Sequence, residues 1–136
     1  GHAVAALVFD TQTQHYVLTR QFRVGAEREL LEIAAGMIDK NERPETAVRR
    51  EIHEELGYEI DQLTEIVTMW PSPGTSAETI AVYYAEVSRQ TGAGGGLAEE
   101  NEQIEMVRLT KEALFKEELQ DAKTLLAVQW AQLHRA

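Results

Sequence analysis

The feature that most constrains this chain is a short helix-forming segment with three glutamates on one side. Residues 45–56 are rich in strong helix formers, Pro44 suits the first helical turn, and Gly57 suits the end of the helix. On a helical wheel, Glu51, Glu54 and Glu55 fall on one face. This face borders an apolar stripe, so we expect the glutamates at the edge of the core. The stripe consists of Val48, Ile52 and Leu56.

Grouping these carboxylates lowers the stability of the helix. Like charges three or four residues apart destabilise a helix by about 0.2–0.5 kcal/mol per pair, and the helix dipole disfavours anions near the C-terminus. Arg49 and Arg50 can offset part of the repulsion. Hard divalent ions offset it better, because Mg²⁺ prefers carboxylate oxygens. A solvated acidic face is the alternative, and the helix alone does not decide between the two.

Composition narrows the class of protein. A chain of 136 residues with 43% hydrophobic content suits one domain over residues 1–136, although it begins directly in a strand, so we expect an N-terminal segment to be missing. The formal net charge of −10 disfavours nucleic-acid binding and fits divalent cations better. The absence of cysteine favours a reducing cytoplasm. No apolar run approaches the roughly 20 residues that span a bilayer, so we expect no membrane association.

The hydrophobic pattern predicts strands and helices in mixed order. Extended segments are expected at Ala3–Phe9, Tyr16–Phe22, Leu30–Ala35, Leu63–Trp70, Thr79–Val87 and Ile104–Leu109, the first two as a hairpin and the last as an edge strand. Charged or polar loops are expected at Val24–Glu29 and Met37–Arg43, a turn at Pro71–Gly74, and a flexible glycine loop at Gly92–Gly96. Helices are expected at Glu45–Leu56, Lys111–Glu118 and Ala122–His134. This order predicts an α/β (α+β) fold, a mixed β-sheet with helices on both faces.

The last helix is expected to pack on the sheet through an apolar face. The residues at helical spacing are Ala122, Leu125, Leu126, Trp130 and Leu133. Trp70 and Trp130 are both expected in the core.

The residues around the glutamate helix form a longer pattern. Gly36 is followed after five residues by Glu42, then after seven by Arg50-Glu51-Ile52, then by Glu54-Glu55, Gly57 and Tyr58. This segment resembles the Nudix box and matches its fixed residues; seven such matches occur by chance about once in 10⁸ windows at average residue usage. The box usually ends in an aliphatic residue, and we expect Tyr58 to alter packing only.

The resemblance implies a Nudix fold, an α/β/α sandwich, and a hydrolase of nucleoside diphosphates linked to another group. It implies Mg²⁺ as cofactor, with Mn²⁺ as a possible substitute. The metal ligands it implies are Glu51, Glu55, Glu102 and the carbonyl of Ala35. Glu54 is a candidate catalytic residue that binds metal or orients a metal-bound water. Glu42, Arg50 and Gly57 match structural positions of the box, with a salt bridge between Glu42 and Arg50.

Segments outside the box resemble the ADP-ribose pyrophosphatase and nucleotide-sugar pyrophosphatase branch. They are TRQFR at 19–23, LEIAAG at 31–36, SPG at 72–74, GLAEENE at 96–102 and LAVQW at 126–130. By this similarity, Glu100 is the candidate base on a loop for which the preceding glycines serve as hinges. Arg23, Glu78 and Gly36 are candidates for substrate binding. The resemblance also implies a cytoplasmic homodimer.

The leading expectation is Mg²⁺-dependent hydrolysis of ADP-ribose to AMP and ribose 5-phosphate. The same chemistry on another nucleotide sugar, GDP-mannose foremost, is the nearest alternative. A catalytically silent Nudix domain that senses a nucleotide sugar is disfavoured, because the box glutamates are all present. An RNA-decapping enzyme is disfavoured by the net charge of −10.

Overall fold

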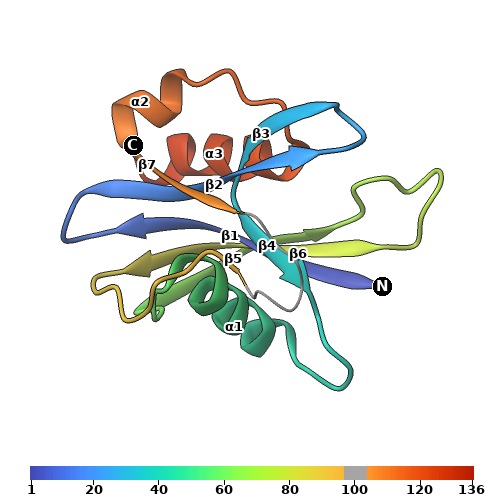
Figure 1. The fold of residues 1–136 in the computed structure, drawn as a ribbon. Helices are drawn as coiled ribbons and strands as arrows, with labels where there is room; N and C mark the ends of the chain where they lie inside the picture. Colours follow the sequence, from blue (N-terminus) through green and yellow to red (C-terminus); the bar gives the residue numbers. More distant parts are fainter. Residues whose placement is uncertain (97–103) are drawn as a thin grey trace.

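A computed structural model describes residues 1–96 and 104–136 of the chain (Figure 1). The strands are β1 (His2–Asp10), β2 (His15–Arg23), β3 (Arg28–Glu32), β4 (Ala34–Met37), β5 (Gln62–Met69), β6 (Thr79–Val87) and β7 (Glu105–Thr110). The helices are α1 (Pro44–Leu56), α2 (Lys111–Lys116) and α3 (Ala122–His134).

The strands form one mixed sheet. Its main path is β3-β2-β1-β6-β5, while β4 pairs with β1 and β7 pairs with β2. β1 and β6 run parallel along their whole lengths, and the other pairs are antiparallel. The predicted hairpin of β1 and β2 is confirmed. Among the described strands, β7 pairs with β2 only, as expected for an edge strand.

The predicted extended segment Leu30–Ala35 is two strands that part at Ile33. The first, β3, pairs with β2, and the second, β4, crosses to β1, where Ala35 lies opposite Ala5. The loop predicted at Met37–Arg43 was therefore wrong at Met37, where β4 ends, and the loop predicted at Val24–Glu29 was wrong at Arg28 and Glu29, where β3 begins. Sequence periodicity does not show the break, since apolar residues continue through it.

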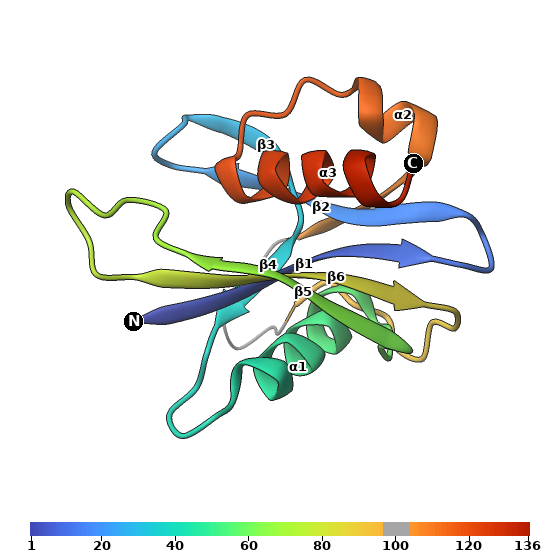
Figure 2. The same cartoon turned by 180° about the vertical axis from the view of Figure 1, so that it is seen from behind.

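The helices cover both faces of the sheet, as the predicted α/β/α sandwich requires. Figure 2 shows α1 on one face and α2 with α3 on the other. Beneath α1 lies one buried cluster that includes Val4, Ala6, Val48, Ile52 and Leu56. A second cluster beneath α3 includes Leu7, Tyr16, Leu18, Tyr84 and Val128. Alternate residues of β1 therefore belong to the two clusters on opposite faces of the sheet, because strand side chains alternate between faces.

Two expectations about the C-terminal helices were wrong in detail. α2 ends at Lys116, two residues early. α3 does pack on the sheet, but Ala122, Leu125 and Leu133 of the predicted face are exposed. The buried residues are the smaller Thr124, Ala127, Val128 and Ala131, and small side chains let the helix approach the sheet closely.

Trp130 is partly buried against the second cluster, whereas Trp70 lies beyond β5 and is 58% exposed. None of the described helices has the length and apolar character needed to cross a bilayer.

Candidate active site

The site is organised around α1, whose ends are set by the sequence. Pro44 occupies the first turn, where its missing N–H is not needed, and Gly57 ends the helix with a left-handed φ of 76°. The Gly57 N–H donates to the carbonyls of Ile52 and His53. The apolar side of α1 is fully buried, which fixes the direction in which its polar side faces.

The glutamates of α1 lie at the edge of the core as predicted, and two of them are buried. Glu51 is 7% exposed and Glu55 is 2% exposed. Glu55 Oε1 accepts a hydrogen bond of 3.2 Å from the Ala35 N–H. A Cβ atom at Gly36 would lie 2.0 Å from Glu51 Cδ, so any side chain there would displace the Glu51 carboxylate. β4 and α1 are therefore packed so that backbone and carboxylates meet directly.

Arg50 is the hub of the polar side of the box. Its guanidinium contacts Glu42 at 2.9 Å, Glu51 at 2.8 Å and Glu54 at 3.3 Å, and it donates to the Met37 carbonyl at 3.0 Å. The hydrogen bond to Glu42 is the largest cause of a strongly raised pKa for Arg50, and it lowers the pKa of Glu42. Arg50 thus offsets carboxylate repulsion within the box, whereas Arg49 contacts the Ile60 carbonyl instead.

The donor set suits a hard divalent cation. Glu51 and Glu55 supply buried carboxylate oxygens beside the backbone of Ala35 and Gly36, and Mg²⁺ favours oxygen ligands of this kind. Within residues 1–96 and 104–136, no group of three or more histidine, aspartate or glutamate side chains is gathered closely enough to hold a metal ion by itself. The predicted ligand Glu102 and the predicted base Glu100 lie outside the described residues.

The glycine loop at Gly92–Gly96 hydrogen-bonds to the end of α1, and its role as a hinge stays a prediction. The N–H groups of Gly95 and Gly96 donate to the carbonyls of Glu55 and Glu54, at 2.7 and 3.1 Å. These are carbonyls of the last helical turn, which have no partner within the helix. Gly94 has φ 75°, and a Cβ there would lie 2.7 Å from the Glu55 oxygen. The glycines allow the loop to approach the C-terminal end of α1 closely and hydrogen-bond to it, a contact called here the clasp.

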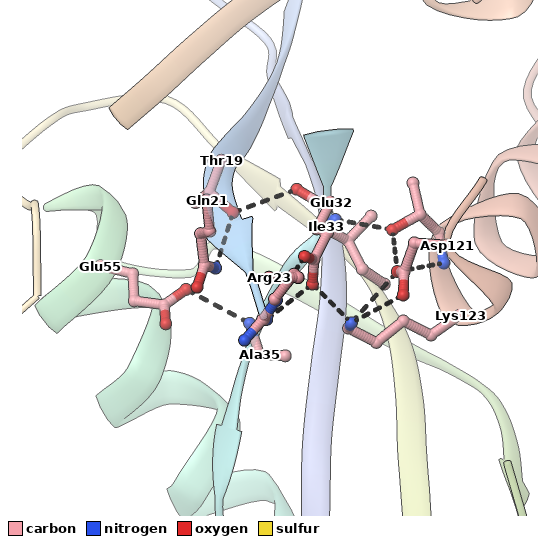
Figure 3. Close-up of polar contacts among 10 residues, drawn as sticks. Thr19, Gln21, Arg23, Glu32, Ile33, Ala35, Glu55, Asp121 and Lys123 are labelled. Atoms are coloured by element: carbon pink, nitrogen blue, oxygen red, sulfur yellow. Dashed lines mark hydrogen bonds and ion pairs between the residues drawn. The ribbon is translucent and has the colours of Figure 1, made fainter. Parts of the chain in front are cut away.

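Arg23, the last residue of β2, lies in a part-buried polar network (Figure 3). Its Nε and Nη2 atoms donate to the two oxygens of Glu32 at 2.6 and 2.7 Å. Glu32 is only 1% exposed, and it also accepts from Lys123 of α3 at 2.8 Å. Neither Glu32 nor Lys123 was predicted as a site residue from the sequence. A charged residue within the apolar run LLEIAA was the available signal for Glu32, and nothing local marked Lys123.

Glu78 lies just before β6, half-buried, and its N–H donates to Ser76 Oγ at 3.0 Å. The next residue, Thr79, pairs with His2 at the start of β1. Among the described residues, no hydrogen bond or ion pair links the Glu78 side chain to the box.

Fold and site together define a domain of the Nudix class. A mixed sheet lies between helices, and one face carries the glutamate-bearing helix α1, preceded by the loop that follows Gly36. The family model of the NUDIX domain matches residues 1–128. The chain belongs to the Nudix family.

Curated relatives align along almost the whole chain. An ADP-ribose pyrophosphatase of Haemophilus influenzae is 33% identical over 149 residues, which cover 100% of this chain and 69% of the relative. An ADP-ribose pyrophosphatase of Bacillus subtilis is 37% identical over 138 residues, covering 98% and 74%. A GDP-mannose pyrophosphatase of Escherichia coli is 34% identical over 144 residues, covering 97% and 74%.

A solved structure described as an ADP compounds hydrolase has a similar fold. It superimposes with a TM-score of 0.81 and covers 99% of this chain and 75% of its own, at 23% sequence identity. At that identity the likeness establishes the fold alone, and it agrees with the predicted Nudix architecture.

Proposed function

We propose that this chain hydrolyses the diphosphate bond of ADP-ribose, giving AMP and ribose 5-phosphate. The observation that carries the proposal is the pair of buried carboxylates, Glu51 and Glu55, held against Ala35 and Gly36. ADP-ribose is favoured as substrate because relatives named ADP-ribose pyrophosphatase align over the whole chain rather than over the box alone.

Nudix hydrolases generally use divalent metal ions, and Mg²⁺ is the ion we propose, with Mn²⁺ as a substitute. Glu51, Glu55 and the Ala35 carbonyl would hold it, with Glu102 as a further ligand. When bound, such an ion neutralises diphosphate charge and lowers the pKa of a coordinated water. The preference of Mg²⁺ for oxygen ligands fits the buried carboxylate oxygens of Glu51 and Glu55.

The chain's own residues have the remaining tasks. Arg23 binds a phosphate or ribose group of the substrate through its guanidinium, and Glu78 contacts the substrate from the start of β6. Gly36, which has no side chain, leaves room for the Glu51 carboxylate and contacts the substrate through its backbone. Glu100 removes the proton from the attacking water, and Glu54 orients that water; general-base assistance is typically worth about 10²–10⁴-fold in rate.

GDP-mannose is the second candidate substrate. The supporting observation is the relative named GDP-mannose pyrophosphatase, at 34% identity, within the same range as the ADP-ribose relatives. A sensor without catalysis is disfavoured, because Glu51, Glu54 and Glu55 are all present on α1.

A substrate panel with Mg²⁺ tests the proposal. ADP-ribose, GDP-mannose, diadenosine polyphosphates and 8-oxo-dGTP are compared, and the nucleotide products are separated by chromatography. We expect the highest kcat/KM for ADP-ribose, with AMP as product. Faster turnover of GDP-mannose would transfer the assignment to the second candidate. Turnover of a nucleoside triphosphate alone would contradict both.

We further propose a cytoplasmic homodimer. Light scattering coupled to size-exclusion chromatography gives the mass in solution, and a mass near 15.3 kDa would contradict the dimer.

A further inference from the structure

Among the described residues, the carboxylate of Glu32 is the most deeply buried charge that the box does not use. Figure 3 shows it between Arg23 of β2 and Lys123 of α3, two cations that are far apart in the sequence. Arg23 takes both oxygens at 2.6 and 2.7 Å, and Lys123 Nζ lies 2.8 Å from Oε1. A buried carboxylate needs such partners, because an uncompensated charge in the interior is very unfavourable.

The two cations differ in how they are exposed. The Lys123 side chain is 13% exposed, whereas the Arg23 side chain is 44% exposed. Nε and Nη2 of Arg23 donate to Glu32. The third nitrogen, Nη1, lies on the opposite side of the guanidinium from Glu32. Arg23 therefore offers solvent a donor and a charge, while Lys123 is enclosed.

Lys123 is itself held in place by the start of α3. Its Nζ lies 3.1 Å from Asp121, which also accepts from the backbone and hydroxyl of Thr124 at 3.3 and 2.6 Å. Thr124 Oγ1 in turn accepts the Ile33 N–H at 2.9 Å. The first turn of α3 is thus fixed to the point where β3 gives way to β4.

This junction is close to the box. Two residues after Ile33, the Ala35 N–H donates to Glu55. The pKa of Arg23 is raised chiefly by its hydrogen bond to Glu32, and the negative charge of Glu55 adds to that rise. Arg23 consequently lies within electrostatic range of a box glutamate.

We infer that Lys123 is a positioning residue for substrate binding: by sharing Glu32 with Arg23, it orients the guanidinium and leaves part of its charge for a substrate phosphate. Without Lys123, Glu32 would be neutralised by Arg23 alone, and an arginine fully committed to a buried carboxylate attracts an anion less. The inference rests on the proposed role of Arg23 in binding the substrate.

Lys123→Met tests it, because methionine keeps the length of the side chain and removes the charge. With ADP-ribose as substrate we expect KM to rise by roughly fivefold to twentyfold while kcat changes less than about twofold. Lys123→Arg should recover most of the affinity. In a Glu55→Gln background, where turnover is slow, the Kd for ADP-ribose measured by calorimetry should follow the same pattern.

A double-mutant cycle with Arg23→Gln separates positioning from a merely structural role. If Lys123 acts through Arg23, the effect of Lys123→Met on KM should vanish once Arg23 is replaced. The matched control is Lys111→Met, because Lys111 anchors the other end of α3 through the Arg135 carbonyl at 2.7 Å. We expect this control to lower Tm and leave KM unchanged.

The outcomes distinguish a failure of the role of Lys123 from a failure of the proposed function. An unchanged KM in Lys123→Met, or the same KM rise with and without Arg23, would overturn the inference and leave the proposed function intact. An unchanged KM in Arg23→Gln would overturn the role of Arg23 and the inference with it. A wild-type chain that does not hydrolyse ADP-ribose would overturn the proposed function.

Discussion

The hydroxyl group of Tyr58 donates a hydrogen bond of 2.6 Å to the carboxylate of Asp10. Both residues are buried, and Tyr58 occupies the box position that is usually aliphatic. Arg108 of β7 donates to the same hydroxyl at 3.2 Å and to Gln90 at 3.1 Å. The expectation that Tyr58 alters packing only was therefore incomplete, because it also links the end of the box to β1 and β7.

Tyr58→Phe should destabilise the fold. The change removes a donor from a buried carboxylate, so we expect the free energy of unfolding to fall by about 1–3 kcal/mol. Urea denaturation measures it. Tyr83→Phe is the control, since no hydrogen bond of the Tyr83 hydroxyl is recorded with any residue in the described ranges, and it should cost clearly less. Equal losses in the two variants would show that the contact with Asp10 contributes nothing.

Stability should fall in acid because of Asp10 and Glu32. Burial raises the pKa of each, but hydrogen bonds outweigh it: those of Tyr58 and the backbone lower the pKa of Asp10, and those of Arg23 and Lys123 lower the pKa of Glu32. A depressed pKa in the folded state stabilises the protein above the ordinary values of 3.8 and 4.5, and this contribution is lost as pH falls through the folded pKa.

Urea unfolding at a series of pH values from about 6 down to about 3 checks this dependence. We expect the wild type to lose more stability below the ordinary carboxylate pKa values than Asp10→Asn, which cannot titrate at that position. Parallel curves for the two proteins would argue against the linkage.

Gly94→Ala should disturb the clasp on α1. A Cβ at this position meets the Glu55 oxygen at 2.7 Å, and the φ of 75° is unfavourable for alanine. We expect a loss of roughly 2 kcal/mol or more in unfolding free energy. Gly74→Ala is the matched control, because a Cβ there meets nothing within 4 Å. Similar stability of the two variants would mean that the loop yields easily.

Glu55→Gln should abolish most of the catalysis while the fold persists. The amide keeps the volume and can still accept from Ala35, but it loses the charge that would hold a cation. We expect kcat/KM to fall by at least about 10²-fold. Circular dichroism checks the fold, and Glu45→Gln, in the first turn of the same helix, is the control that should retain activity. Full activity of Glu55→Gln would show that the glutamates of α1 do not form the metal site.

Replacing Glu100 and Glu102 should affect different steps. As the proposed base, Glu100→Gln should lower kcat more than it raises KM. As a proposed ligand, Glu102→Gln should raise the Mg²⁺ concentration needed for half-maximal rate. Steady-state kinetics over a range of Mg²⁺ concentrations measures both. A rise in KM without a loss of kcat would make Glu100 a substrate-binding residue.

The box and the fold class could be read from the sequence, because both depend on local order along the chain. Pro44 and Gly57 set the limits of α1, and the spacing of Val48, Ile52 and Leu56 directs the glutamates toward the core edge. The strand pattern was sufficient for a mixed sheet. The face that α3 buries was predicted only in part: Leu126 and Trp130 pack against the second cluster, but the fully buried positions hold small side chains, whereas periodicity favours large apolar ones.

What the sequence by itself determined is the carboxylate-bearing helix and the family to which it belongs. Only the tertiary structure decided how Arg23 is held, since its partner Glu32 lies on β3 and is shared with Lys123 from near the C-terminal end of the chain. It also decided that the glycines before residue 97 clasp α1. Such contacts depend on distances between segments that are remote in sequence, and a buried charge such as Glu32 reveals its partners only when the chain has folded around it.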